Sequence, residues 1–219
     1  MSHKKSPRRP PQFDLIAGSL PLDFINTLDD RFSNEPKELL KSYTDLARFA
    51  EDTHILEPQE ADHLSQLSQE NPREADRALR AAIELREAMF AVIWAMVTKK
   101  PAPRSALQTL NRHLQQSAQH SSLVPENGKF AWRFDESRNH IEAPLWPIAP
   151  AAAELLASEH LEFVRACASE TCQWLFLDVS KNHRRRWCDM TRCGNRAKVR
   201  NFYARQKRSS RKIRMGAPS

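Results

Sequence analysis

The sequence has no apolar run long enough to cross a membrane. Its longest unbroken run is Ala88–Val97, whereas a helix that spans a bilayer needs about 20 apolar residues. The basic start MSHKKSPRRPPQ is not followed by the apolar stretch and cleavage site of a secretory signal. We therefore expect a cytoplasmic protein without a membrane partner. With 219 residues, 40% of them hydrophobic, the chain has room for one core domain and a small appendage.

Acidic residues are almost missing from one segment. Between Lys181 and Arg214 a single acid, Asp189, stands against fourteen lysines and arginines, which gives the segment a charge of +13. The first ten residues add +4, so the whole-chain charge of +7 leaves −10 for residues 11–180. A concentrated positive surface attracts polyanions, above all nucleic acid. The charge distribution therefore predicts a basic binding segment on an acidic body.

Cysteine is also scarce, and all its copies fall in one short region. Cys167, Cys172, Cys188 and Cys193 form the pattern C-x4-C-x15-C-x4-C. Two close pairs from separate segments are typical of a four-cysteine zinc site, because tetrahedral coordination needs two ligand pairs brought together. We predict one structural Zn²⁺ bound by these four residues.

Other uses of four cysteines fit the sequence less well. Disulfides persist in oxidising compartments, and this chain shows no export signal. A catalytic zinc keeps one coordination position open and typically has three protein ligands. Four thiolates give a zinc site a net charge of about −2, which Arg192 and Arg196 on either side of Cys193 can offset.

Most of the chain before Ser158 has the periodicity of amphipathic helices. Apolar residues recur at three- and four-residue steps over 39–50 and 75–97, and again over 106–118 after the proline-rich KPAPR. The stretch PLWPIAPAAAELLAS predicts one further short helix with a proline-marked start.

Two regions have the character of strands instead. Phe130, Trp132 and Phe134 alternate with polar or small residues, and the polar DESRN then leads into HIEAPL, which predicts a small hairpin. Further on, LEFVRAC and QWLFLDVS are β-rich on either side of Cys167 and Cys172. We expect the first cysteine pair in the turn of a second hairpin.

These patterns predict an α+β protein that is mostly α with small β elements. Residues 11–157 form a helical domain with a minor β-hairpin, and residues 158–211 form a four-cysteine zinc finger of β-hairpins and one basic helix. Residues 1–10 and 212–219 are expected to be disordered tails.

The basic helix of the finger starts just after the last cysteine. Gly194 is one of only four glycines, which suggests a backbone conformation that other residues tolerate poorly, and Asn195 is a good N-cap. From there to about Arg208 the pattern is helical. Its apolar face, which we expect to pack back on the zinc hairpins, consists of Val199, Phe202, Tyr203 and Gln206.

The motif CGNR at Cys193–Arg196, preceded by WLFLDVSKNHRRRWCDM, resembles the CGNR-type zinc fingers. Near the N-terminus, LIAGSLPLDFINTLDDR resembles the opening of the ABATE domain, which accompanies that finger in a family of bacterial stress-related transcription regulators. Together the two resemblances cover nearly the whole chain. They imply zinc bound by the four cysteines, DNA binding by the finger and regulation through the N-terminal domain. Lys181, His183 and the three following arginines depart mildly from the usual turn of this family.

DNA contacts are expected from the turn and from the helix of the finger. Arginine and lysine neutralise phosphates, arginine also pairs with guanine, and asparagine pairs with adenine. The predicted DNA-binding residues are Arg184, Arg185, Arg186, Arg192, Asn195, Arg196, Lys198, Arg200, Arg205, Lys207 and Arg208.

The N-terminal domain offers one candidate ligand site. In LPLDFINTLDD, Asp23, Asn26 and Thr27 could line a pocket, although capping and internal hydrogen bonds also explain such residues. The regulatory resemblance allows for a homodimer and for a small-molecule effector, which the sequence does not identify.

Two other functions stay open. The basic helix would also suit structured RNA or an acidic protein, in an interaction module rather than a DNA-binding regulator. A nuclease would use His183 as its general base, but Asp178 and Asp189 are the only acids near it, and no carboxylate cluster follows to hold a catalytic metal. We therefore expect no enzymatic activity.

Overall fold

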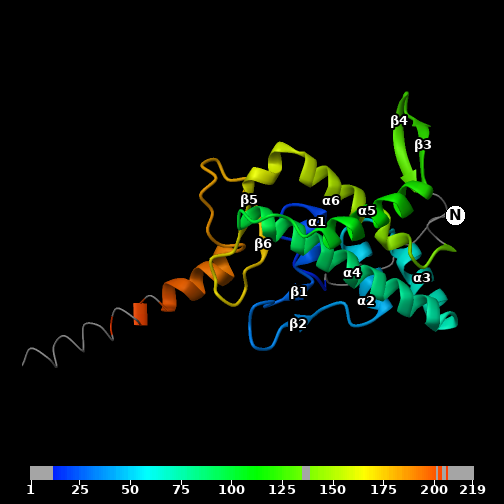
Figure 1. Ribbon diagram of the computed structural model, residues 1–219. Helices are drawn as coiled ribbons and strands as arrows, with labels where there is room; N and C mark the ends of the chain where they lie inside the picture. The colour runs from blue at the N-terminus through cyan, green and yellow to red at the C-terminus, as the bar shows by residue number, and fades with distance from the viewer. Residues whose placement is uncertain (1–11, 135–138, 201, 204–205, 207–219) are drawn as a thin grey trace, which may run out of the picture.

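Helices form the larger part of the protein (Figure 1). The computed structural model describes residues 12–134, 139–200, 202, 203 and 206. Its α-helices are α1 (Leu20–Ile25), α2 (Tyr43–Asp52), α3 (Pro58–Glu70), α4 (Pro72–Val97), α5 (Arg104–Gln119) and α6 (Ile148–Ala157), and its 3₁₀ turns include η2 (Ala143–Leu145) and η3 (Glu159–Phe163). This confirms a mostly α fold with small β elements.

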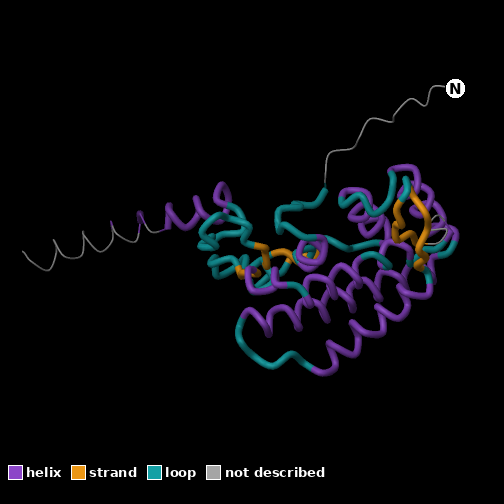
Figure 2. Tube along the Cα trace, turned by 90° about the horizontal axis from the view of Figure 1, so that it is seen from above, coloured by secondary structure: helices purple, strands orange, loops and turns teal. Residues whose placement is uncertain are grey.

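Helix α4 forms because its apolar residues recur at helical spacing over seven turns. Ala78, Ala82, Leu85, Met89 and Ile93 are all fully buried, and alanine at two of these positions lets neighbouring helices approach closely. Helix α5 runs beside α4 in both views (Figures 1 and 2). The helices predicted over 75–97 and 106–118, and the short helix after the prolines, are confirmed.

The helix predicted from residue 39 begins later than expected. Ser42 and Asp45 form a reciprocal capping box, so α2 starts at Tyr43. Residues 39–41 are not helical, and the backbone N–H of Leu39 donates to the carbonyl of Thr27. Sequence analysis also missed α3, whose buried side is limited to Ala61, Leu64 and Ser68 and gives a weak periodic signal.

Within the described residues, three antiparallel two-stranded sheets accompany the helices. They pair β1 (Leu28–Asp29) with β2 (Lys37–Glu38), β3 (Ser121–Glu126) with β4 (Lys129–Phe134), and β5 (Val164–Ala166) with β6 (Leu175–Leu177). The hairpin around the first cysteine pair is confirmed, since the turn between β5 and β6 contains Cys167 and Cys172.

The partner predicted for the strand at Phe130–Phe134 is wrong. This strand pairs with the residues before it, and the later segment HIEAPL runs into the 3₁₀ turn η2. The turn of the hairpin is Asn127–Gly128, and both residues have positive φ (50° and 77°), as two-residue hairpin turns require. This Asn-Gly pair was the sequence signal that the prediction overlooked.

The main hydrophobic core contains residues from both sides of residue 158. Leu22 and Phe24 of α1 belong to it together with Leu175 and Phe176 of β6, and all four are fully buried. The predicted boundary between residues 157 and 158 stays a prediction, as do the tails at 1–10 and 212–219, which lie outside the described residues. Across the part of the chain that the structure describes, every helix is too short or too polar to span a bilayer.

Candidate metal centre and nucleic-acid interface

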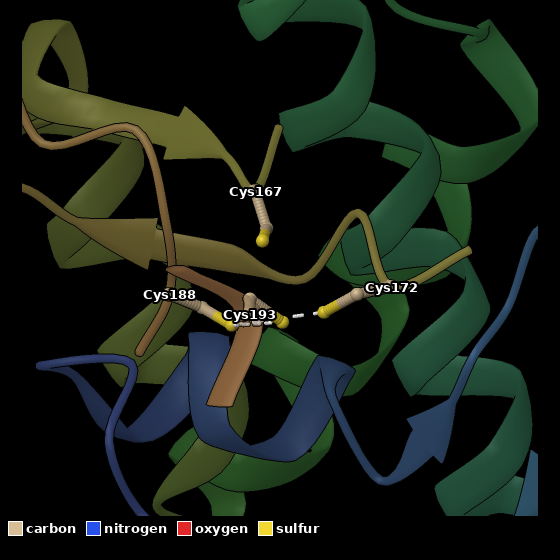
Figure 3. A group of neighbouring side chains, drawn as sticks. All are labelled: Cys167, Cys172, Cys188 and Cys193. Carbon is tan, nitrogen blue, oxygen red and sulfur yellow. Dashed lines mark hydrogen bonds between the residues drawn. The ribbon is translucent and has the colours of Figure 1, made fainter. Parts of the chain in front are cut away.

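Four buried thiols meet where the finger contacts the helical domain (Figure 3). Cys167 follows β5, Cys172 precedes β6, Cys188 follows the basic turn, and Cys193 lies in η4 (Met190–Gly194), one turn of π-helix. Their exposed fractions are between 2% and 5%. Their Sγ atoms point toward one another and all lie within 4.8 Å of one another. The chain therefore brings together the four residues that the spacing predicted.

The distances between the sulfur atoms suit zinc rather than disulfides. Tetrahedral zinc with Zn–S bonds of about 2.3 Å holds its sulfurs about 3.8 Å apart. The Sγ atoms of Cys172 and Cys188 are 3.6 Å apart, and those of Cys188 and Cys193 are 3.7 Å apart. A disulfide needs about 2.05 Å, and all four cysteines are free. Four thiolates complete the coordination shell, so the zinc ion is structural.

Neighbouring thiols lower the pKa of Cys167 but raise the pKa of Cys172 and of Cys188, and burial raises that of Cys193. Backbone N–H groups favour the deprotonated state that metal binding needs, as those of Cys188 and Ser169 do for the Cys167 sulfur. The backbone N–H of Trp174 likewise bonds the Cys172 sulfur. Such donors fix the orientation of ligands and spread the negative charge of a thiolate centre.

The helix that follows Cys193 is capped by a residue other than the one predicted. The Asp189 carboxylate accepts hydrogen bonds from the backbone N–H groups of Thr191 (2.5 Å) and Arg192 (3.2 Å), and the Thr191 hydroxyl is the main cause that lowers the pKa of Asp189. Asn195 already has helical dihedral angles, and its Nδ2 donates to the Thr191 carbonyl at 3.0 Å. Its prediction as an N-cap is therefore wrong.

Gly194 is constrained by a neighbouring side chain rather than by its backbone conformation. Its φ is not positive, in contrast to Gly18 and Gly128. A Cβ at position 194 would instead overlap the Sδ atom of Met190. The rarity of glycine in the sequence therefore did mark a constrained position. The constraint is the neighbouring Met190 side chain and not the backbone conformation that we expected.

Asp178 organises the basic turn between β6 and Cys188. Its carboxylate is fully buried and accepts from the N–H and hydroxyl of Ser180 (3.0 and 2.5 Å) and from the N–H of Arg185 (2.8 Å). Burial alone would raise the pKa of Asp178, but these hydrogen bonds outweigh it and hold that pKa below its usual range. His183 has φ 46°, stacks on Phe163 at 4.0 Å and has its Nδ1 2.7 Å from the Asp178 carbonyl oxygen.

Two of the predicted DNA-binding arginines are engaged within the protein. The Arg185 guanidinium donates to the carbonyls of Trp187 (2.8 Å) and Cys188 and lies 4.7 Å from the centre of the Phe176 ring. Arg192 forms a bidentate ion pair with Asp14, with Nη2 2.9 Å from Oδ1. Sequence reasoning did not foresee these contacts, because the conformation of the turn brings the carbonyls of Trp187 and Cys188 to Arg185, and the tertiary fold brings Asp14 to Arg192.

Other predicted cations face solvent. Arg184 and Arg186 are exposed in the turn, and Arg196, Lys198 and Arg200 are exposed on the helix over residues 195–200. None of the five forms an ion pair with a residue that the structure describes. Arg205, Lys207 and Arg208 lie outside the described residues, so their DNA contacts stay predictions.

The apolar face of this helix points away from the core. Val199, Phe202 and Tyr203 are 54%, 57% and 60% exposed, whereas Ala197 on the opposite side is only 7% exposed. Gln206 is exposed as well. The expectation that this face packs on the zinc hairpins is therefore wrong, and Figure 1 shows the helix leaving the body of the protein. A helix that exposes both an apolar stripe and the cations Arg196, Lys198 and Arg200 is suited to contact another molecule.

The N-terminal segment binds the finger through several polar contacts. Nδ2 of Asn26 donates to the carbonyl of Leu175 at 2.9 Å, while Oδ1 of Asn26 accepts from the N–H of the same residue at 3.2 Å. The N–H of Leu177 donates to the Ala17 carbonyl at 2.7 Å. The Trp174 indole donates to Asp29 at 2.8 Å. Residues just before and just after α1 thus form hydrogen bonds with the free edge of β6.

Thr27 and Asp23, the other two candidate ligand-binding residues, are also engaged inside the fold. The Thr27 hydroxyl donates to the Phe24 carbonyl at 2.7 Å and accepts from the buried guanidinium of Arg86 at 3.2 Å. The Asp23 carboxylate accepts from the N–H of Ala17 at 2.9 Å, and burial raises its pKa to about 6. Two surface cavities are lined by other residues. Ligand binding by Asp23, Asn26 and Thr27 stays a prediction.

Fold and site together define a protein with a helical domain and a zinc-stabilised finger. Comparison with known families makes this specific. The ABATE family model, described as a putative stress-induced transcription regulator, matches residues 18–159. The CGNR zinc finger model matches residues 164–206. The chain belongs to the ABATE family and has a CGNR zinc finger, which confirms both resemblances seen in the sequence. No curated protein matches this sequence.

Proposed function

We propose that the protein binds DNA through the outward cations of its zinc finger and so regulates transcription. One observation carries the proposal. Arg184, Arg186, Arg196, Lys198 and Arg200 are exposed on a finger whose backbone is held by four metal ligands. Fixed cations lose less conformational freedom on binding than cations on a flexible tail. The regulatory description of the family supports the same function.

We assign two roles to the predicted DNA-binding residues. In this proposal Arg185 and Arg192 hold the finger in shape, because their guanidinium groups already have partners within the chain. The five outward cations contact phosphates. Asn195 is exposed, but its amide already bonds the Thr191 carbonyl, so it contributes to the helix start and not to base reading.

The outward stripe of the helix supports contact with bases as well as phosphates. Val199, Phe202 and Tyr203 lie among the cations and are all more than half exposed. Apolar side chains on a helix in the major groove can contact the methyl group of thymine. Their placement therefore allows contacts with bases in addition to contacts with phosphates.

Salt dependence tests the proposal directly. Five neutralised phosphates give a slope of log K against log[salt] of about −4.5 on duplex DNA. We expect fluorescence anisotropy to show this slope and the double variant Arg196→Ala/Arg200→Ala to reduce its magnitude by about 2. The matched control is Arg73→Ala/Arg104→Ala, which removes two exposed arginines outside the finger and should leave the slope unchanged. A slope near zero for the unmodified protein would contradict DNA binding.

Competition among polyanions separates the alternatives. At physiological salt we expect duplex DNA to displace a labelled duplex more effectively than RNA or heparin of equal charge, because phosphates and grooves are both contacted. Equal competition by all three would favour a general polyanion-binding module. Selection of bound sequences from random DNA with the zinc-loaded protein would then give the preferred site.

We also propose that the protein is not an enzyme. The four cysteines leave no coordination position for a reacting water. The His183 ring, which a nuclease would need as its general base, is held by Phe163 and the Asp178 carbonyl. Plasmid DNA incubated with the protein and Mg²⁺ or Mn²⁺ should stay intact. Cleavage that His183→Ala abolishes would contradict this proposal.

A further inference from the structure

The β3–β4 hairpin carries apolar side chains on one exposed face. The register pairs Leu123 with Trp132 and Pro125 with Phe130. Because side chains two residues apart point to the same side of a strand, these four share one face, which we call the hairpin face. Leu123, Phe130 and Trp132 are 56%, 70% and 68% exposed, and Pro125 is exposed as well. Apolar side chains gathered in this way on a protein surface typically mark a contact with another molecule.

The hairpin projects from the end of the protein that lies opposite the finger (Figures 1 and 2). Its root is anchored by Phe134, which is half-buried and whose ring centre lies 6.4 Å from that of Trp146. A two-stranded hairpin is only marginally stable in water without further packing. A partner that covers the hairpin face would supply that packing.

The hairpin face has no charge, which restricts what can cover it. The charged residues of the hairpin are Glu126, Lys129 and Arg133, and the register places them on the opposite face. There Glu126 and Arg133 form an ion pair. A nucleic acid or a charged peptide would meet no opposite charge on the hairpin face. An apolar surface is instead complementary to the same surface on another copy, as in the two-fold interfaces of homodimers.

We propose that the hairpin face is a homodimer interface, in which two copies of the chain stack these faces about a two-fold axis. This proposal does not rest on DNA binding. The finger lies at the other end of the protein (Figure 2), so the dimer leaves both basic helices open.

The area of the hairpin face determines how strong the dimer is. A buried aromatic side chain contributes about 150–250 Å², so four apolar side chains that are about two-thirds exposed bury about 450 Å² on each chain. The total of about 900 Å² lies between crystal contacts and standard interfaces of about 1,200–2,000 Å². We therefore expect a reversible dimer with a Kd of about 10–100 µM.

Analytical ultracentrifugation of the full zinc-loaded chain tests the proposal. From about 1 to 500 µM, a range that brackets the expected Kd, the mean mass should rise from that of one chain toward that of two. Trp132→Glu and Phe130→Glu each place a charge in the apolar interface and should weaken the dimer about 30-fold or more. Leu107→Glu is the matched control. It introduces the same charge at an exposed leucine of α5 and should leave the Kd unchanged.

Because the substituted side chains are exposed, all three variants should fold, and circular dichroism and zinc content will verify this. Trp132→Phe keeps an aromatic ring in the interface and should retain the dimer within about threefold. An unmodified chain that stays monomeric at the highest concentration overturns the proposal, because a different molecule must then cover the face. A dimer that persists in both glutamate variants also overturns it, because the contact must then lie elsewhere.

Discussion

The side-chain amide of Asn26 pairs with both backbone groups of Leu175, at 2.9 Å and 3.2 Å. The Asn26 amide thereby forms the two hydrogen bonds that a neighbouring strand would form with the free edge of β6, although 149 positions separate the two residues. Since Cys172 lies just before β6 in the sequence, the helical domain supports the strand that positions a metal ligand. The ABATE domain and the zinc finger are thus joined by the same contact that completes the small sheet.

Asn26→Ala should destabilise both parts of the protein together. Loss of the amide leaves the N–H and carbonyl of Leu175 buried without partners, which costs about 3 kcal/mol and lowers the melting temperature by about 6–12 °C. Zinc release to a chelator should become faster in the same variant. Asn111→Ala, at an exposed position of α5, is the control. A normal melting temperature with faster zinc release would show that the contact serves the finger alone.

Neighbouring arginines in the basic turn should have separate roles. Arg185→Ala removes two hydrogen bonds to backbone carbonyls and the contact with Phe176, so it should lower the free energy of unfolding by about 2 kcal/mol. Arg186→Ala removes only the contact of its guanidinium with the Trp187 ring, 5.4 Å from the ring centre, so it should lower the free energy of unfolding by less than about 1 kcal/mol and reduce the magnitude of the salt slope for DNA by about 1. Thermal unfolding and anisotropy of both variants check this. Equal effects of the two substitutions on stability would contradict separate roles for Arg185 and Arg186.

Asp23 should make the protein less stable as the pH rises above about 4. Its folded-state pKa is about 6, raised by burial from 3.8, so between these values the folded state binds more protons than the unfolded state. Stability then falls as the pH increases through this window. Asp23→Asn keeps an acceptor for the N–H of Ala17 and removes the charge. We expect it to stabilise the protein by about 1–2 kcal/mol at pH 7.5 and by little at pH 4, as measured by urea unfolding. A stabilisation equal at both pH values would argue against the raised pKa.

Gly194→Ala should destabilise the protein only when residue 190 is methionine. The new Cβ overlaps the Met190 Sδ, so the long side chain must move, at a cost of about 1 kcal/mol. In a Met190→Ala background the same change should be neutral or slightly stabilising, because alanine favours the helical backbone at this position. A double-mutant cycle by thermal unfolding, with zinc content held at one per chain, measures the coupling. Additive effects would show that the two residues do not interact.

The outward stripe of the last helix should contribute affinity that does not depend on salt. Phe202→Ala/Tyr203→Ala removes two exposed rings but no charge. DNA affinity should fall about 30-fold or more, since contacts between aromatic side chains and bases contribute about 1–3 kcal/mol each, while the salt slope stays unchanged. Thermal stability should also be unchanged because both rings are exposed. Full DNA affinity in this variant would assign the stripe to some other partner, and the salt slope of the unmodified protein would still test DNA binding itself.

Local features of the sequence determined the metal centre and the main helices. The four cysteines were predicted from their number and spacing alone, because metal-binding chemistry depends on which residues are present and little else in this chain competes for zinc. Helices α4 and α5 were predicted from the period of their apolar residues, which a helix of many turns repeats often enough to be unambiguous. Short α1 and polar α3 lacked that repetition and were missed.

Only the tertiary structure decided which polar and charged side chains are available for function. Arg185 and Arg186 are adjacent in the sequence, yet one holds backbone carbonyls and the other faces solvent. Val199, Phe202 and Tyr203 have the spacing of a packed face but lie opposite the buried Ala197. The reason is physical: the sequence defines a side chain's chemistry and local period, whereas its partners depend on the folded conformation and can come from distant segments, as Asn26 shows with Leu175. Periodicity alone predicts that a helix has an apolar side, and packing decides whether that side meets the core or another molecule.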